Sequence, residues 1–110
     1  MTDDSILTRF DFLAQSGELL RGPRQENYGD AIVNISRFAV MMSVVVNTQV
    51  TPIQAALTLV SLKLSRLASP TISLASAVDS IVDAIAYLAI AGEFLAVATP
   101  KSSEVNDGGG

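Results

Sequence analysis

Two aspartates, Asp79 and Asp83, stand four residues apart in a segment with few other charges, and Tyr87 follows at the same interval. On a helix this spacing places all three side chains on one face. Carboxylate oxygens are the ligands that Mg²⁺ and Mn²⁺ prefer in proteins, and a phenol ring can stack on a nucleotide base. The spacing is a reasonable metal geometry, although aspartates one turn apart are also common on exposed helices.

Two cations, Lys63 and Arg66, occupy one face of the preceding apolar segment at an interval of three residues, and Arg37 lies further upstream. Lysine and arginine donate charge-assisted hydrogen bonds to phosphate oxygens. If these cations face the aspartates, they form a pocket that suits a nucleotide, with a divalent cation bridging carboxylates and phosphates.

The stretch RQENYGDAIVNISRF, residues 24–38, supplies further polar groups. Asp30, Asn34 and Arg37 form one helical stripe, while Arg24 and Tyr28 come from the loop before it. Gly29 gives that loop freedom to turn Tyr28 inward. We therefore predict that Arg24, Tyr28, Asp30, Asn34, Arg37, Lys63, Arg66 and Tyr87 bind the ligand.

A simpler interpretation treats the same residues as ordinary surface groups. Lys63 or Arg66 would then pair with Asp79 or Asp83 for a fraction of a kcal/mol. Asp30 would only cap the helix that follows it, which is worth about 1 kcal/mol, and Tyr28 would pack over the end of the bundle. Asp30 can serve both as cap and as ligand.

The amino-acid composition limits the kinds of binding and catalytic site that this chain can form. The formal net charge is −4, with seven basic and eleven acidic residues, no His and no Cys. General nucleic-acid binding through a basic patch is therefore not expected. Metal chemistry would have to use oxygen ligands, and neither a disulfide framework nor a thiol nucleophile exists.

The 110 residues suit one domain of three or four helices. We predict an all-α, four-helix single domain over residues 1–100 and a disordered polar tail over 101–110. The first helix starts at a cap among residues 2–5 and ends at Gly22-Pro23. The others span about 30–46, about 52–68 after the cap Thr51, and from a cap at Ser73 or Ser76 to about 99. Apolar spacing keeps Val44–Val46 helical.

Charge is scarce on the surface as well. Only 16% of residues are charged, against roughly 25% in a typical soluble domain, and residues 38–62 carry no charge. Helix faces this apolar are expected to meet other subunits, which predicts a homo-oligomer, a dimer or tetramer. The mean hydropathy is +0.43, but the stretch NTQVTPIQ interrupts the long apolar run, and the acidic start lacks a signal-peptide core. We predict no membrane association and a cytoplasmic location.

Three blocks in order carry a resemblance to known families: RQENYGDAIVNISRFA (24–39), TPIQAALTLVSLKLSRL (51–67) and DSIVDAIAYLAIAGE (79–93). Together they resemble a family of small phage and prophage proteins of uncharacterised function. Their layout is similar to nucleotide modification associated domain one. More distantly, VDSIVDAIAYLAIA (78–91) resembles the last conserved helix of the MazG-type all-α nucleoside triphosphate pyrophosphatases.

The phage resemblance implies that the protein acts in the cytoplasm of a phage-infected bacterial host. The MazG resemblance implies a MazG-like helical bundle and Mg²⁺ or Mn²⁺ as cofactor, with Asp83 and Asp79 as metal-binding catalytic residues. This chain departs from the MazG pattern, because Lys63 and Arg66 stand where an earlier helix carries E-x-x-E, and Ser80 replaces the Glu of E-x-x-D.

The sequence therefore leaves three functions open. The first is a (d)NTP pyrophosphohydrolase. The second is a non-catalytic oligomeric binder, or sponge, of a nucleotide or cyclic nucleotide signal. The third is a structural or protein-interaction module that uses its apolar helices.

Overall fold

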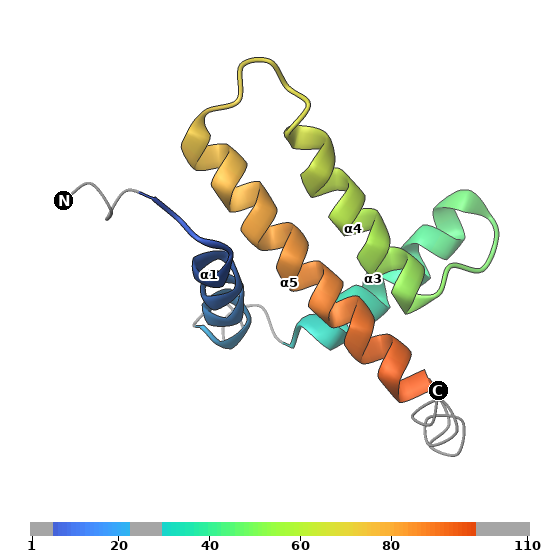
Figure 1. The fold of residues 1–110 in the computed structure, drawn as a ribbon. Helices are drawn as coiled ribbons and strands as arrows, with labels where there is room; N and C mark the ends of the chain where they lie inside the picture. The colour runs from blue at the N-terminus through green and yellow to red at the C-terminus, as the bar shows by residue number, and fades with distance from the viewer. Residues whose placement is uncertain (1–5, 23–29, 99–110) are drawn as a thin grey trace, which may run out of the picture.

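The computed structural model describes residues 6–22 and 30–98, and this part of the chain is all-helical. Its helices are α1 (Arg9–Arg21), α3 (Ala31–Val46), α4 (Pro52–Arg66) and α5 (Leu74–Ala98). α4 and α5 lie side by side as an antiparallel hairpin, α1 packs on α5, and α3 crosses the hairpin and packs on α4 (Figure 1). The prediction of an all-α protein with four helices is confirmed. Residues 101–110, predicted to be a tail, lie outside the described residues, so the predicted domain limits stay a prediction.

Local side-chain caps explain where α3, α4 and α5 begin. The Asp30 carboxylate accepts a hydrogen bond from the Ile32 amide at 3.1 Å. Thr51 and Gln54 form a reciprocal capping box around Pro52, whose missing N–H is harmless in the first turn. The Ser73 hydroxyl accepts from the Ser76 amide at 3.1 Å. The sequence-based starts of these three helices are therefore confirmed.

The start of α1 differs from its predicted position. The N-cap is Thr8, whose hydroxyl accepts from the Asp11 amide while the Asp11 carboxylate accepts from the Thr8 amide. A capping box satisfies two free backbone donors together, so the helix begins here. The predicted cap at residues 2–5 was therefore wrong, because Ile6 and Leu7 precede the helix rather than belonging to it.

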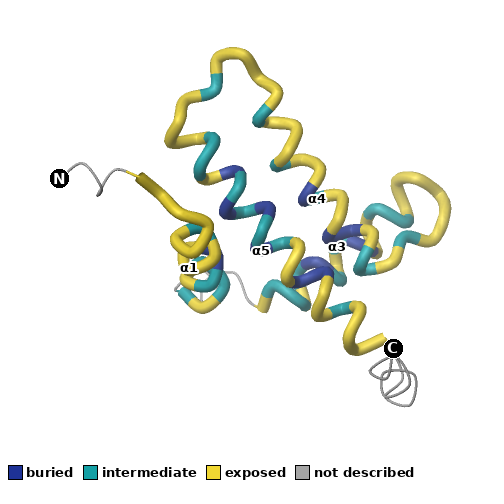
Figure 2. Tube along the Cα trace, in the orientation of Figure 1, coloured by how far each residue is buried: buried dark blue, intermediate teal, exposed yellow. Residues whose placement is uncertain are grey.

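The hydrophobic core is built mainly from small side chains. One cluster joins α3, α4 and the C-terminal half of α5 (Figure 2). Its members are Ile35, Ala39, Ala55, Ala56, Ile90 and Ala91. Among the described residues, no large hydrophobic side chain is fully buried. Alanine lets helices approach closely, but each one removes little apolar surface from water.

α5 is the central helix of the fold. It contacts both α1 and α4 and contributes six buried residues. By length and composition alone it is also long and apolar enough to cross a membrane, and within the described residues it alone meets that test. A core helix of a soluble protein meets the same test, so this is weak evidence, and the predicted absence of membrane association stays a prediction.

Candidate functional site

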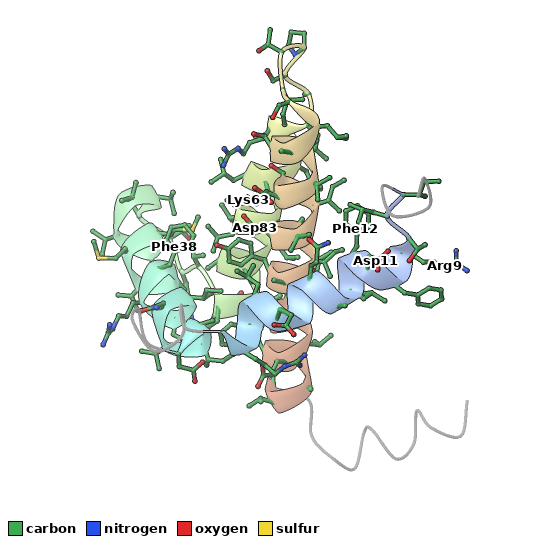
Figure 3. The ribbon with its side chains drawn as sticks, turned by 90° about the vertical axis from the view of Figure 1, so that its left-hand side faces the viewer. Arg9, Asp11, Phe12, Phe38, Lys63 and Asp83 are labelled. Atoms are coloured by element: carbon green, nitrogen blue, oxygen red, sulfur yellow. The ribbon has the colours of Figure 1, made fainter. Side chains whose placement is uncertain are left out.

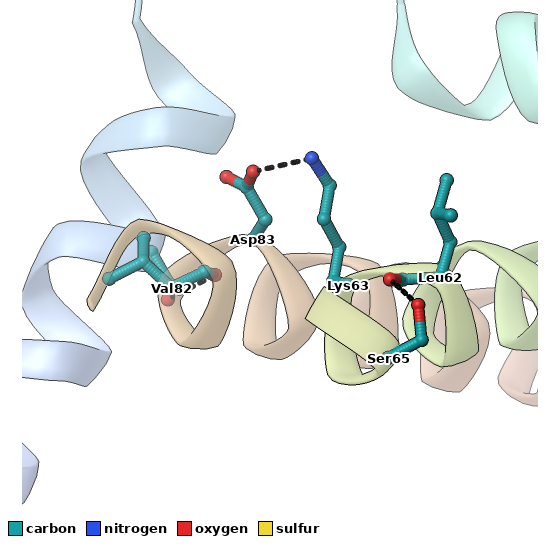
Figure 4. A network of polar contacts seen from close by, with 6 residues as sticks. Leu62, Lys63, Ser65, Val82 and Asp83 are labelled. Atoms are coloured by element: carbon teal, nitrogen blue, oxygen red, sulfur yellow. Dashed lines mark hydrogen bonds and ion pairs between the residues drawn. The ribbon is translucent and has the colours of Figure 1, made fainter. Parts of the chain in front are cut away.

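Lys63 of α4 and Asp83 of α5 meet across the helical hairpin. The Lys63 Nζ lies 3.0 Å from the Asp83 Oδ2, and the two side chains are 19% and 23% exposed (Figure 4). This is the one ion pair within the described residues. A partly buried pair is less screened by solvent than an exposed one, so it helps to hold α4 and α5 in register.

An open groove of about 490 Å³ runs between α1 and α5 beside this ion pair. Its walls carry three carboxylates, Glu18 from α1 and Asp79 and Asp83 from α5. Gln15, Leu19 and Val82 complete the lining. Figure 3 shows α1 crossing in front of α5 near Asp83, so the groove is an inter-helix feature.

A buried hydrogen bond fastens α1 to α5 next to the groove. The Ser16 hydroxyl, buried within α1, donates to the Val82 carbonyl oxygen at 2.9 Å. Val82 itself lines the groove, and Glu18 lies two residues after Ser16. The bond therefore sets the position of Glu18 relative to the two aspartates.

The predicted site residues on α3 do not line this groove. Asp30 is the exposed N-cap of α3, and Arg37 is exposed on its outer face. Asn34 is half-buried. The expected meeting of Asp30, Asn34 and Arg37 with Asp79 and Asp83 is not seen in the groove, because α3 packs mainly on α4 whereas α1 packs on α5.

The remaining predicted residues have separate places. Tyr87 is half-buried and packs against the hydrophobic core, so in this structure its ring contributes to packing. Arg66 is exposed in the last turn of α4. Arg24 and Tyr28 lie outside the described residues. The ligand-binding roles assigned to all these residues stay predictions.

Oxygen ligands for a divalent cation are present, but they are not gathered into a preformed cage. In residues 6–22 and 30–98, no group of three acidic side chains is close enough to hold a metal ion as it stands. Mg²⁺ commonly binds through one or two carboxylates, with waters and substrate phosphates completing its shell. Asp79 and Asp83, one turn apart on one wall, match that smaller requirement.

Glu18 is the groove residue that sequence reasoning missed. In the sequence it is a single carboxylate in SGELL, and no spacing rule connects residue 18 to residues 79 and 83. Its place in the groove depends on how α1 packs on α5. The only hint in the sequence is that Glu18 lies on an amphipathic helix, two residues after the small residue Ser16, which is buried where α1 packs.

A second open hollow, of about 400 Å³, lies between the end of α3 and α4. Its lining includes Gln49, Gln54 and Thr58 together with Met42 and Leu57. None of the residues that line it carries a charge, so it offers little to a phosphate or a metal ion.

Comparison with known families gives one result. The domain of unknown function DUF6378 matches residues 11–95, which include all four described helices except the ends of α1 and α5. No curated protein and no solved structure matches the chain.

Proposed function

The chain belongs to the DUF6378 family, and we propose that it handles nucleotides at the groove between α1 and α5. The proposed activity is MazG-like. Water attacks the α-phosphorus of a (deoxy)ribonucleoside triphosphate, and the bond breaks between the α-phosphorus and the oxygen that links it to the β-phosphorus. The products are the nucleoside monophosphate and pyrophosphate. A phage would use this reaction to shape the nucleotide pool of its bacterial host, and the proposed location is therefore the host cytoplasm.

One observation carries the proposal: three carboxylates from two helices share one open groove, and a lysine contacts one of them. In a chain with only 16% charged residues, Glu18, Asp79 and Asp83 line one groove, and Lys63 contacts Asp83. A solvated helix face does not require carboxylates from two helices to share one groove. The resemblance of residues 78–91 to the last conserved helix of MazG-type pyrophosphatases supports the same assignment.

Each residue has a role in this proposal. Asp79 and Asp83 would hold Mg²⁺ or Mn²⁺, and Glu18 on the facing wall would orient the attacking water. A divalent ion bound here would neutralise phosphate charge. Lys63, which neutralises Asp83 in this structure, would contact a phosphate oxygen when the carboxylate turns to the metal.

The test is to incubate the protein with a mixture of ribo- and deoxyribonucleoside triphosphates and Mg²⁺ or Mn²⁺, and to identify the products by mass spectrometry. Appearance of a monophosphate and pyrophosphate supports the proposal. Asp83→Asn is expected to lower turnover by about 100-fold. Glu93→Gln is the matched control, because Glu93 is an exposed carboxylate on the same helix outside the groove. Equal loss in both variants would contradict the assignment.

A second candidate is a nucleotide binder without turnover, which would act as a sponge for a nucleotide or cyclic nucleotide signal. It is favoured by the lack of a preformed three-ligand metal group in the described part of the chain and by the ion pair that already occupies Asp83. In this case Lys63→Ala abolishes ligand retention in equilibrium dialysis and Asp83→Asn barely changes it. If neither substitution changes retention or turnover, the groove is not the nucleotide site.

A further inference from the structure

The Asp83 carboxylate faces both the groove and the neighbouring helix α4. It lines the groove between α1 and α5, and its Oδ2 lies 3.0 Å from the Nζ of Lys63, a residue of α4 that does not line the groove. Figure 4 shows the two side chains pointing toward each other across the hairpin. In the described part of the chain, Asp79 and Glu18 form no such ion pair. Lys63 is therefore the cation that a metal ion has to displace from Asp83.

A divalent cation by itself meets two obstacles at this carboxylate. It has to separate the Lys63 ammonium, on a side chain that is only 19% exposed, from its one acidic partner among the described residues. A partly buried charge left without a partner is costly. The protein also supplies few ligands, since no three acidic side chains within residues 6–22 and 30–98 are close enough to hold a metal ion.

A polyphosphate removes both obstacles when it arrives together with the cation. Phosphate oxygens complete the shell of a cation that the protein holds through one or two carboxylates. They also accept charge-assisted hydrogen bonds from lysine, and the Lys63 Nζ already lies at the Asp83 carboxylate. Without the cation, the three carboxylates of the groove would repel the same polyphosphate. Every charge therefore keeps a partner only when the cation and the polyphosphate bind together.

We propose that Lys63 is a placeholder for the metal ion at Asp83, so that the groove takes a divalent cation and a polyphosphate as one complex and excludes either of them alone. On binding, Lys63 passes from Asp83 to a phosphate oxygen, and no covalent bond changes. The ligand class is a metal-bound nucleoside di- or triphosphate, as opposed to a monophosphate or a cyclic nucleotide. This inference rests on the proposed nucleotide function of the groove and adds to it the form in which the nucleotide is bound.

The first test is equilibrium dialysis of the protein against Mn²⁺, against α,β-methylene analogues of ATP, GTP, CTP and UTP, and against both together. These analogues resist cleavage at the proposed bond. We expect the unmodified protein to retain Mn²⁺ and an analogue together about tenfold or more above the retention of each alone. Lys63→Met removes the charge and keeps an unbranched side chain that suits a helix. It should retain Mn²⁺ alone about tenfold more strongly and the complex about tenfold less, and loss of the fold cannot give these opposite changes.

Arg9→Met is the matched control for the change in charge. Arg9 lies at the exposed end of α1, where its guanidinium carbon is 4.8 Å from the centre of the Phe10 ring, and it points away from Asp83 (Figure 3). Its replacement removes the same single positive charge and should leave both retentions unchanged. If Lys63→Met alters the retention of Mn²⁺ no more than Arg9→Met does, the inference is overturned.

The second test needs no variant. With Mn²⁺ present, the unmodified protein should retain the triphosphate analogues about tenfold or more above nucleoside monophosphates and cyclic nucleotides, because only a polyphosphate reaches both the cation and Lys63. Equal retention of these classes, or binding of Mn²⁺ that is as tight without an analogue, would overturn the inference and leave the proposed nucleotide function standing. If the protein retains no nucleotide under any of these conditions, the proposed function fails, and the inference fails with it.

Discussion

The groove between α1 and α5 differs from the outer face of α3 in how many charged residues it carries. At the groove, Glu18, Asp79 and Asp83 line one open space, and Lys63 contacts Asp83. On the outer face of α3, Arg37 stands among the exposed apolar side chains Val33, Val40, Met41, Val44 and Val45. Several of the few charged residues of this chain therefore lie at one groove, and an exposed apolar surface lies elsewhere in the fold.

The two regions also differ in what holds them to the rest of the fold. α1 is fastened to α5 by a specific buried hydrogen bond from Ser16. α3 is held by apolar contacts around Ile35 and Ala39. The groove side should therefore respond to the loss of single polar groups, and the α3 side to changes in volume and apolar area.

The largest effect is expected from overpacking the alanine core on the α3 side. Ala56 is 0% exposed in the cluster shared by α3, α4 and α5. Ala56→Leu has no space for its added carbons and should lower the free energy of unfolding by about 2 kcal/mol, measured by urea denaturation. Ala75→Leu, at an exposed position in the first turn of α5, is the control and should change it little. Equal stability of the two variants would show that the core is loosely packed.

Removing the hydroxyl of Ser16 tests the polar attachment of the groove side. Ser16→Ala removes the bond to the Val82 carbonyl and should cost about 1 kcal/mol of unfolding free energy. Ser65→Ala makes the same chemical change where the hydroxyl donates to the Leu62 carbonyl on an exposed face of its own helix (Figure 4). Its effect should be near zero, because alanine is the better helix former. A neutral Ser16→Ala would mean that α1 is held by apolar contacts alone.

Arg37 tests the exposed apolar face of α3. Arg37→Leu makes this face uniformly apolar, so we expect the protein to self-associate several-fold more strongly, measured by sedimentation at a series of dilutions. Arg66→Leu, at an exposed position in the last turn of α4, should leave self-association unchanged. If Arg37→Leu weakens self-association, the guanidinium makes a specific contact rather than interrupting an apolar surface.

The smallest effect is expected at the start of α1, next to the groove-bearing helix face. Hydrogen bonds from the Thr8 backbone amide, and secondarily from its hydroxyl, lower the pKa of Asp11 below 3.8. A carboxyl whose folded pKa is lowered adds stability above its unfolded pKa, and this is lost as the pH falls through the folded value. Asp11→Asn should therefore flatten the loss of stability below about pH 4, measured by chemical denaturation at each pH. The unmodified protein and the variant should converge at the lowest pH, where Asp11 is protonated.

Much of the local structure was predictable because its causes lie within a few residues. Asp30, the Thr51-Pro52 pair and Ser73 each satisfy free amides of the helix that follows, so the starts of α3, α4 and α5 were readable. α1 was harder, because several residues before it are good caps. The Thr8 and Asp11 spacing is also a capping-box pattern, but only the structure shows that it is the one used.

Only one contact of the candidate site was predictable, the contact between two residues on neighbouring helices of one hairpin. Lys63 and Asp83 were expected to meet either as a surface pair or in a pocket, and they meet. Asp30, Asn34 and Arg37 share a helix but not the groove, since regular spacing says which residues share a face and does not say what that face meets. For the same reason, helical spacing did not predict that Glu18 lines the groove.

The sequence by itself determined the helices, the caps of α3, α4 and α5, and the scarcity of charge, because these depend on contacts between residues a few positions apart and on composition. Only the tertiary structure decided which faces pack together. It placed Glu18 opposite Asp79 and Asp83, turned Tyr87 toward the core and left the valines of α3 outside. The physical reason is that helix docking is set by the summed burial of small apolar side chains on several helices at once, and no single segment contains that sum.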